Sequence, residues 1–368
     1  MHVVVVGGGV LGLSLAWHLA KQKVTVTLID RQNFGREASW AGAGILPPAN
    51  LQTALDPYDQ LRGLSMELHP RWAEELRQTT GIDTGFSVCG GIYLARTRGE
   101  AAALIGWGEE LQEQQIPVEK LDLAEATQWE PGLRWQTDIP IRTAFHLPTE
   151  CQLRNPWHLQ ALEAACRQSG VRLIPDCTIR KLCSSGGRIS ELHTTLGNLR
   201  ADRFCFTTGA WTTPVLASLG IDVRVIPIRG QMVLYRCSSP PLTRIVNEGS
   251  RYIVPRKDGY VLVGSTEEEV GFDKSNTAEG IAGLRAFAES LIPALATAEV
   301  ENTWAGLRPG SFDGLPFLGA VPEWENVFLA TGHFRSGLYI SPATSVVMAE
   351  AILDRPTSID LAPFRLGR

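Results

Sequence analysis

The sequence lacks the cysteine spacing of a metal centre or a disulfide scaffold. Its 368 residues include seven cysteines, an odd number, and no two of them form a CxxC pair. We therefore expect neither a zinc or other metal site nor a disulfide framework. Unpaired cysteines are typical of a reducing compartment, so we predict a cytoplasmic protein.

Long apolar runs and excess positive charge are also scarce. The stretch 3–20 is nearly uncharged, but Gly7-Gly8-Gly9 interrupts it and no basic residues precede it, unlike in a signal peptide. No other stretch approaches the roughly 18 apolar residues of a membrane span. With 34 basic and 39 acidic residues the net charge is −5, which disfavours nucleic acid or a membrane as the main partner.

The pattern of apolar residues predicts an α/β protein. Val3-Val4-Val5-Val6 reads as a buried strand, the leucines of the next segment recur every four residues as in a helix, and residues 24–29 read as a second strand. This is a βαβ unit and predicts a parallel, Rossmann-like sheet. Similar segments return at residues 155–174, where Asn155 is expected to cap a helix, and at residues 326–353.

Two other stretches have the residue pattern of antiparallel strands. One contains Gly91-Ile92-Tyr93-Leu94, and the other contains residues 231–235, 252–254 and 260–263. We therefore predict two domains. Residues 1–85, 150–224 and 301–368 form a discontinuous nucleotide-binding domain, and residues 86–149 and 225–300 form a mainly antiparallel α+β domain.

The first turn carries a phosphate-binding pattern. Gly7-Gly8-Gly9-Val10-Leu11-Gly12 fits GxGxxG between a strand and a helix, where backbone N–H groups at a helix N-terminus face a pyrophosphate. Asp30 follows Gly12 by 30 − 12 = 18 residues, where an acid binds ribose hydroxyls. The pattern predicts a dinucleotide site but does not separate FAD from NAD.

Four further segments resemble one family. They are Arg36-Glu37-Ala38-Ser39-Trp40-Ala41-Gly42-Ala43-Gly44-Ile45-Leu46-Pro47, Thr207-Thr208-Gly209-Ala210-Trp211, Trp304-Ala305-Gly306-Leu307-Arg308-Pro309-Gly310 and Thr331-Gly332-His333-Phe334-Arg335-Ser336-Gly337-Leu338. In this order they resemble the thiamine-pathway glycine oxidases of the D-amino-acid oxidase flavoprotein superfamily. The resemblance to sarcosine oxidases is weaker.

The resemblance implies FAD, held in the first domain with the substrate in the second. We expect the FAD to be non-covalent, because no cysteine follows Cys237 in the region where some sarcosine oxidases attach flavin. Ile179 is either a backbone contact to adenine or a core residue. The implied cofactor contacts are Gly7, Gly9, Val10, Leu11, Gly12, Asp30, Arg31, Ser39, Trp40, Ala41, Gly42, Ala43, Gly44, Ile45, Ile179, Thr208, Gly209, Trp211, Arg308, His333, Phe334, Arg335, Ser336, Gly337 and Leu338.

The same resemblance implies oxidative deamination of glycine, sarcosine, D-alanine or D-proline. Hydride passes from Cα to flavin N5, and oxygen reoxidises the flavin, so the products are an oxo acid, ammonia and hydrogen peroxide. Two alternatives stay open within enzymes, a D-amino-acid dehydrogenase passing electrons to a quinone or carrier and a sarcosine oxidase-like enzyme. A flavin module that only binds a partner has no use for a carboxylate clamp. The resemblance allows a homo-oligomer, although no segment indicates one.

The reaction needs a cation that grips both carboxylate oxygens, and a guanidinium does so in a bidentate way. By motif position Arg308 is that group, and Tyr252 resembles a second carboxylate contact. Arg335, Glu267 and Ser250 are further substrate candidates, although Arg335 has an alternative as an ion-pair partner and Glu267 as a solvated acid in a charged run. We assign His333 no proton transfer, because the mechanism needs no general base.

Overall fold

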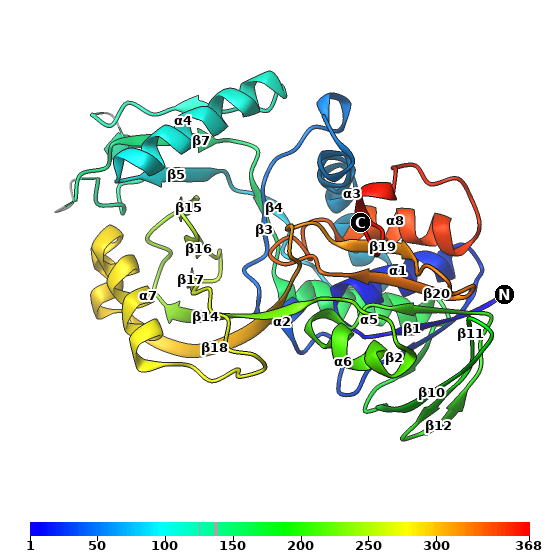
Figure 1. Ribbon diagram of the computed structural model, residues 1–368. Coiled ribbons are helices and arrows are strands. Elements are labelled where there is room, and N and C mark those ends of the chain that lie inside the picture. Colours follow the sequence, from blue (N-terminus) through cyan, green and yellow to red (C-terminus); the bar gives the residue numbers. More distant parts are fainter. Residues whose placement is uncertain (125, 136–138) are drawn as a thin grey trace.

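The computed structural model describes residues 1–124, 126–135 and 139–368. Its two halves are each built on a sheet and lie side by side in Figure 1. The first sheet has six strands, and five of them are parallel while β19 runs antiparallel to β20. In spatial order the strands are β19 (Phe317–Ala320), β20 (Val327–Thr331), β13 (Arg203–Phe206), β1 (His2–Val6), β2 (Thr25–Ile29) and β9 (Arg172–Ile174).

The six-stranded sheet is buried on both faces because its central strand is apolar throughout. Val3 and Val5 face one core cluster, and Val4 and Val6 face another. Helices cover the first face, and a three-stranded antiparallel sheet covers the second. The helices are α1 (Val10–Lys21), α3 (Pro57–Thr80), α5 (Asn155–Gln168) and α8 (Ser341–Ile352), and the small strands are β10 (Ile179–Ser185), β11 (Arg188–Thr194) and β12 (Gly197–Leu199).

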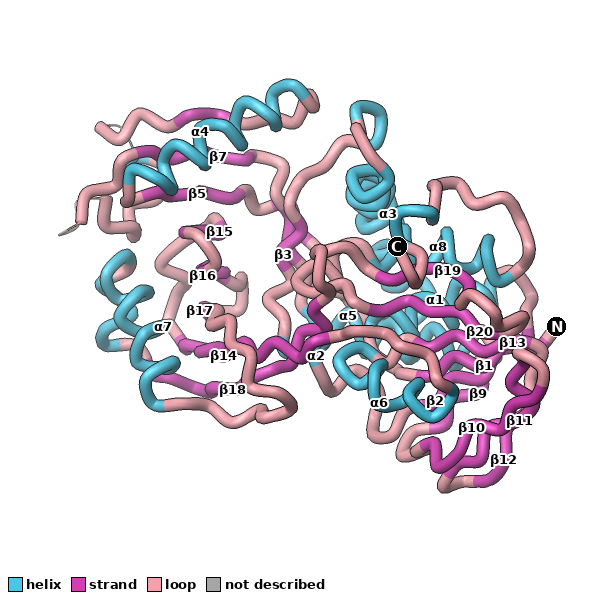
Figure 2. Tube along the Cα trace, in the orientation of Figure 1, coloured by secondary structure: helices cyan, strands magenta, loops and turns pink. Residues whose placement is uncertain are grey.

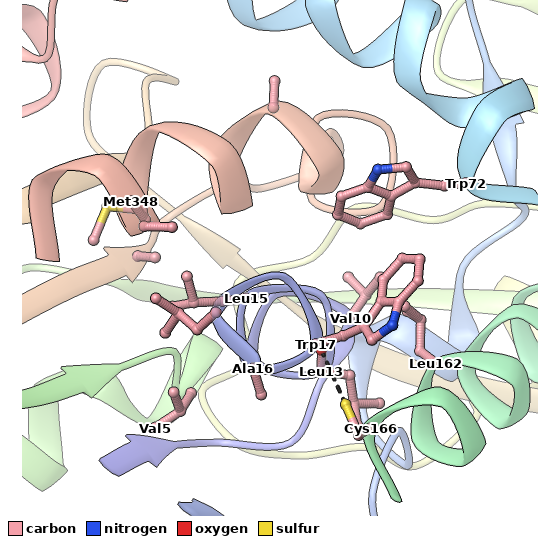
Figure 3. Close-up of a cluster of buried hydrophobic side chains, with 14 of the residues drawn as sticks. Val5, Val10, Leu13, Leu15, Ala16, Trp17, Trp72, Leu162, Cys166 and Met348 are labelled. Atoms are coloured by element: carbon pink, nitrogen blue, oxygen red, sulfur yellow. Dashed lines mark hydrogen bonds between the residues drawn. The ribbon is translucent and has the colours of Figure 1, made fainter. Parts of the chain in front are cut away.

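Helix α1 is the centre of the helical layer (Figure 3). Trp17 meets Trp72 of α3 edge to face with ring centroids 5.0 Å apart, and the Cys166 thiol of α5 donates to the Leu13 carbonyl at 3.4 Å. These contacts fix the position of α1, and its N-terminus carries the glycine turn.

The second sheet has eight strands and makes up the other half of the molecule (Figures 1 and 2). In spatial order they are β18 (Glu299–Gly310), β14 (Ile226–Arg236), β17 (Tyr260–Gly264), β16 (Arg251–Pro255), β15 (Ile245–Glu248), β5 (Gly91–Ala95), β7 (Thr143–Leu147) and β6 (Glu119–Lys120). One face packs on α7 (Ala278–Leu291) through Val233, Ile253 and Val263. On the other face α4 (Arg98–Glu113) covers the β5–β7 end, where Trp107 meets Tyr93 at 4.7 Å.

Short elements connect the two halves. A small sheet of β3 (Ile45–Leu46), β8 (Cys151–Gln152) and β4 (Ser87–Val88) lies between them. The remaining helices are α2 (Ala38–Ala41), α6 (Thr212–Leu216) and the 3-10 turns Leu51–Thr53, Ala126–Gln128, Gly209–Trp211, Ala217–Leu219, Pro293–Thr297 and Ala362–Phe364. Within the described residues, every helix is too short or too polar to cross a lipid bilayer.

The predicted fold class is confirmed, and two local expectations need comment. The expected cap at Asn155 is wrong: Arg154 is the N-cap of α5 without a side-chain bond, and the Asn155 amide donates to the Ser39 carbonyl at 2.8 Å instead. The predicted domain boundary at residue 301 falls inside β18, which pairs with β14 along its length. The division into domains stays a prediction.

Candidate active site

A cavity of about 510 Å³ lies where the carboxyl edge of the six-stranded sheet meets one face of the eight-stranded sheet. Val6, Ile29, Thr207 and Thr331 line it at the ends of four parallel strands. Ligands of open α/β sheets bind outside the carboxyl ends of the strands, so this position is the one expected for a bound nucleotide.

The glycine turn between β1 and α1 has no room for side chains. Gly7 has φ +106°, and a Cβ on Gly12 would lie 1.8 Å from the Gly7 carbonyl oxygen. Gly12 therefore allows α1 to approach the turn, and the helix N-terminus meets the cavity at Gly9 and Val10. The arrangement supplies backbone N–H groups to an anion.

Asp30 lies beside this turn at the end of β2. Its carboxylate accepts from the Gly8 N–H at 2.6 Å and from the Gln32 N–H at 3.0 Å. Burial raises the pKa of Asp30, while these backbone bonds oppose the rise. A carboxylate has about four acceptor positions, so capacity for ribose hydroxyls is left. The neighbouring Arg31 stacks on Trp211, 3.8 Å from its ring centroid, and forms a 2.8 Å ion pair with Glu37.

A segment of small residues forms another part of the wall. Ala41, Gly42, Ala43 and Gly44 all line the cavity, and a Cβ on Gly44 would lie 2.1 Å from the Leu153 carbonyl oxygen. Buried Arg256 donates to the Ala43 carbonyl, so the segment is tied to the second sheet. Its lack of side chains leaves space for a bulky ring and exposes backbone groups to it.

Buried polar atoms of cavity-lining residues that lack a hydrogen-bond partner within the described chain include Asn155 Oδ1 and His333 Nδ1. Buried polar groups are nearly always hydrogen-bonded, so these atoms are suited to a bound polar ligand. Burial lowers the pKa of His333 to about 3, and its Nε2 lies 3.4 Å from Thr344 Oγ1. His333 is therefore neutral at physiological pH. Together with the glycine turn and the small-residue segment, these atoms fit a dinucleotide with a large polar ring.

The opposite wall is one face of the eight-stranded sheet. Cross-strand pairing places one row of residues on that face, in the order Tyr93, Asn247, Tyr252, Gly264, Met232 and Trp304. The residues next to these along each strand, such as Val233 and Ile253, face α7 instead. The alternation therefore turns the polar members of the row toward the cavity.

Arg308 lies on the same face of β18 as Trp304 and Gly306, because it follows them by four and two residues and side chains alternate along a strand. Its guanidinium donates to the Thr266 carbonyl at 3.2 Å and to the Ser265 hydroxyl, and it lies over Gly230, where a Cβ would come within 2.2 Å of Nη1. In the described part of the chain no carboxylate forms an ion pair with Arg308. Of its five N–H donors, three stay available to a ligand.

The predicted substrate candidates are distributed unevenly. Tyr252 lines the cavity, is 9% exposed, and its hydroxyl donates weakly to Met232 Sδ at 3.5 Å. Arg335 also lines the cavity, and it donates to the Ser250 carbonyl at 2.8 Å. Glu267 is exposed and 3.7 Å from Arg335, and neither it nor Ser250 lines the cavity.

Most of the predicted cofactor contacts do line the cavity, Ile179 included, and Gly12 and Trp40 are the exceptions. Gly12 supports the turn from behind, and Trp40 packs on Trp304 with centroids 5.2 Å apart. Sequence reasoning missed other lining residues, among them Tyr93, Asn155, Met232 and Asn247. Most of them can be identified once the strand register around Tyr252 is known.

Comparison with known proteins gives consistent matches over the whole chain. A family model described as FAD dependent oxidoreductase matches residues 2–351. The glycine oxidase of Pseudomonas aeruginosa is 36% identical over 364 residues, which cover 99% of this chain and 98% of that protein. The glycine oxidase of Pseudomonas putida is 36% identical over 371 residues, covering 100% and 99%. The crystal structure of glycine oxidase from Geobacillus kaustophilus matches with a TM-score of 0.92 and 33% identity, over 100% of this chain and 98% of that one.

Proposed function

The chain belongs to the FAD dependent oxidoreductase family and is an amino-acid-oxidising flavoenzyme, and from this premise we propose that it deaminates glycine and other small amino acids. The proposed substrates are glycine, sarcosine, D-alanine and D-proline. Glycine and D-alanine give an oxo acid, ammonia and hydrogen peroxide. The secondary amines also give hydrogen peroxide, but sarcosine releases methylamine instead of ammonia, and D-proline gives a cyclic imine that keeps its nitrogen. When bound, FAD supplies the two-electron acceptor for this oxidation.

The glycine turn, Asp30 and the segment 38–46 are the residues that would hold FAD. We also propose that the FAD is non-covalent. Within the described chain Cys177 is the cysteine that lines the cavity, and its backbone N–H donates to the Asp30 carbonyl at 2.7 Å, at the expected ribose end. All seven cysteines are unpaired, which supports the proposal of a reducing, cytoplasmic location.

The observation that carries the proposal is the guanidinium of Arg308, anchored on the cavity wall without an ionic partner in the described residues. The bonds to Thr266 and Ser265 fix its plane before a ligand arrives, so little side-chain entropy is lost on binding. Its free N–H groups then bind the substrate carboxylate as a bidentate pair. Among the described residues the Tyr252 hydroxyl donates to a thioether, Met232 Sδ, so it turns to the carboxylate at little cost.

Arg335 contributes another positive charge on the cavity wall, but Ser250 and Glu267 hold it at the exposed rim. We propose that it attracts the anionic end of the substrate rather than binding it. His333 remains neutral because of its burial, so it does not compete with Arg308 for the carboxylate.

The test is flavin reduction without oxygen. The purified, FAD-loaded protein is mixed anaerobically with glycine, sarcosine, D-alanine and D-proline, and the visible flavin absorbance is followed. Bleaching by these amines and stoichiometric peroxide after readmission of air support the proposal. Bleaching with slow reaction toward oxygen but fast reaction with a quinone indicates a dehydrogenase. A flavin that none of the four reduces overturns the proposed substrate class.

A further inference from the structure

A segment of the eight-stranded half reaches across to the six-stranded half beside the cavity. Residues 268–277 run from β17 toward α7, and we call them the strap. The first of them, Glu268, pairs with Arg229 of β14 as an isolated bridge, in which each backbone N–H donates to the carbonyl of the other residue, at 2.8 and 3.0 Å. The strap therefore starts from a fixed point on the second sheet.

The side chain of Arg229 holds the strap from below. It is buried, and its Nη1 donates to the Asp273 carboxylate at 2.8 Å and to the Ser275 carbonyl at 3.1 Å. Two residues further along β14, the Gln231 side chain accepts from the Thr277 N–H at 2.7 Å. Hydrogen bonds that involve charged groups are the strong ones in proteins, so the eight-stranded half sets the course of the strap.

The residues on either side of Asp273 contact the six-stranded half instead. Phe272 lies against Trp211, with ring centroids 5.6 Å apart. The Lys274 ammonium lies 3.1 Å from the Glu37 carboxylate. Both of these partners line the cavity, whereas the two strap residues do not. The strap therefore supports the cavity wall from its outer side.

Both strap contacts meet at Arg31, the residue after Asp30. The Arg31 guanidinium stacks on Trp211, 3.8 Å from the ring centroid, and forms a 2.8 Å ion pair with Glu37. Each of these two partners is thus held by the strap as well. In the described residues Arg31 gives one of its five N–H donors to Glu37. Because Arg31 lines the cavity, its other donors are left for phosphate or ribose oxygens of a bound dinucleotide.

We propose that the strap retains FAD by holding Arg31 in place. Phe272 and Lys274 are then positioning residues, which act on the cofactor through the two partners of Arg31. A guanidinium whose partners are fixed loses less side-chain entropy when the cofactor binds, so the cofactor is bound more tightly. The inference concerns FAD and goes beyond the proposed function, since it does not depend on which amine is oxidised.

The test is the FAD affinity of the apoprotein, measured without substrate from the change in flavin fluorescence. Phe272→Ala/Lys274→Met removes both strap contacts and leaves every cavity-lining residue in place. Ordering one long side chain on binding corresponds to a loss of affinity of about threefold to tenfold. We expect the FAD dissociation constant to rise by that factor. Lys274→Arg keeps the ion pair and is expected to bind FAD as the wild type does.

Arg31→Ala separates this role from a merely structural one. Without the guanidinium the strap has nothing to hold, so removing its contacts in the Arg31→Ala background should change the dissociation constant less than about twofold. A strap that merely stabilises the fold would lower FAD affinity equally in both backgrounds. Phe272 and Lys274 are exposed, so their removal leaves the core packing intact, and the single variants serve if the double variant folds poorly.

Phe312→Ala/Lys120→Met is the matched control, because these residues are exposed and do not line the cavity. We expect it to bind FAD with wild-type affinity. Equal affinity in the wild type and the strap variant overturns the inference, and so does an equal loss with and without Arg31. FAD that leaves the wild-type protein only when a covalent bond is broken overturns it as well. A wild-type protein that oxidises none of the four amines overturns the proposed function and leaves this test unaffected.

Discussion

The position of the Arg308 guanidinium can be tested without changing Arg308. It lies over Gly230, and a Cβ at residue 230 would be 2.2 Å from Nη1, 2.3 Å from Nη2 and 2.4 Å from Cζ. Ordinary contact begins at 3.4 Å, so Gly230→Ala moves the guanidinium by at least 3.4 − 2.2 = 1.2 Å. A charge-assisted hydrogen bond contributes about 1.5–3 kcal/mol. Losing one hydrogen bond of the bidentate pair therefore raises the substrate dissociation constant by a factor of about 10 to about 100.

The assay is rapid anaerobic mixing of the FAD-loaded protein with increasing concentrations of the substrate that the wild-type protein oxidises fastest. The half-saturating concentration, at which the rate of flavin reduction is half of its maximum, reports binding, and the amplitude of the bleaching confirms that FAD is still present. Gly283→Ala on α7 is the control, because a Cβ there meets nothing within 4 Å and leaves binding unchanged. An unchanged half-saturating concentration in Gly230→Ala refutes the placement of the carboxylate at Arg308.

Three further outcomes follow from the structure. Gly12→Ala is expected to purify without flavin, because its Cβ would lie 1.8 Å from the Gly7 carbonyl oxygen; a normal ratio of flavin to protein contradicts this role. Asp30→Ala leaves the Gly8 and Gln32 N–H groups without acceptors, so reconstitution of the apoprotein should need at least about fivefold more FAD; equal affinity counts against the predicted ribose contact. Urea unfolding should show lower stability at pH 5 than at pH 7. Unfolded histidines take up protons below a pKa of about 6.5, whereas burial keeps four folded histidines neutral, with pKa values of about 4, 4, 3 and 3 for His18, His69, His158 and His333. Glu150, with a raised pKa of about 7, and Asp30, whose pKa burial also raises, oppose the trend. Four histidines outweigh them, so equal or higher stability at pH 5 contradicts this account.

The parts of the fold that local sequence decides were predictable. The run Val3–Val6 is β-branched and apolar at every position, which is typical of a strand buried on both faces. In β1, Val3 and Val5 lie on one side and Val4 and Val6 on the other. Asn155 shows the limit. Its side chain has a local option as a helix cap and a distant option at the Ser39 carbonyl, and the distant partner wins. The local sequence around Asn155 gives no information about the distant Ser39 carbonyl.

The candidate site divides in the same way. The nucleotide side was predictable because GxGxxG and Asp30 act through backbone geometry within one βαβ unit. Tyr93 and Asn247 carry no local signal, since an aromatic and an amide residue are ordinary on strands. Asn247 becomes a neighbour of Tyr252 through the β15–β16 hairpin, and Tyr93 joins them through the pairing of β15 with β5, which is far away in the chain. Glu267 was a candidate because of its place after Thr266, but in the structure it is exposed and faces Arg335.

The central claim is that FAD and a carboxylate clamp share one cavity, with Arg308 as the clamp. A crystal structure of the FAD-loaded protein with acetate tests it most directly. We expect the acetate oxygens to accept from the Arg308 guanidinium, beside the flavin ring and within reach of the Tyr252 hydroxyl. Acetate bound elsewhere, or a flavin ring far from Arg308, would contradict the account.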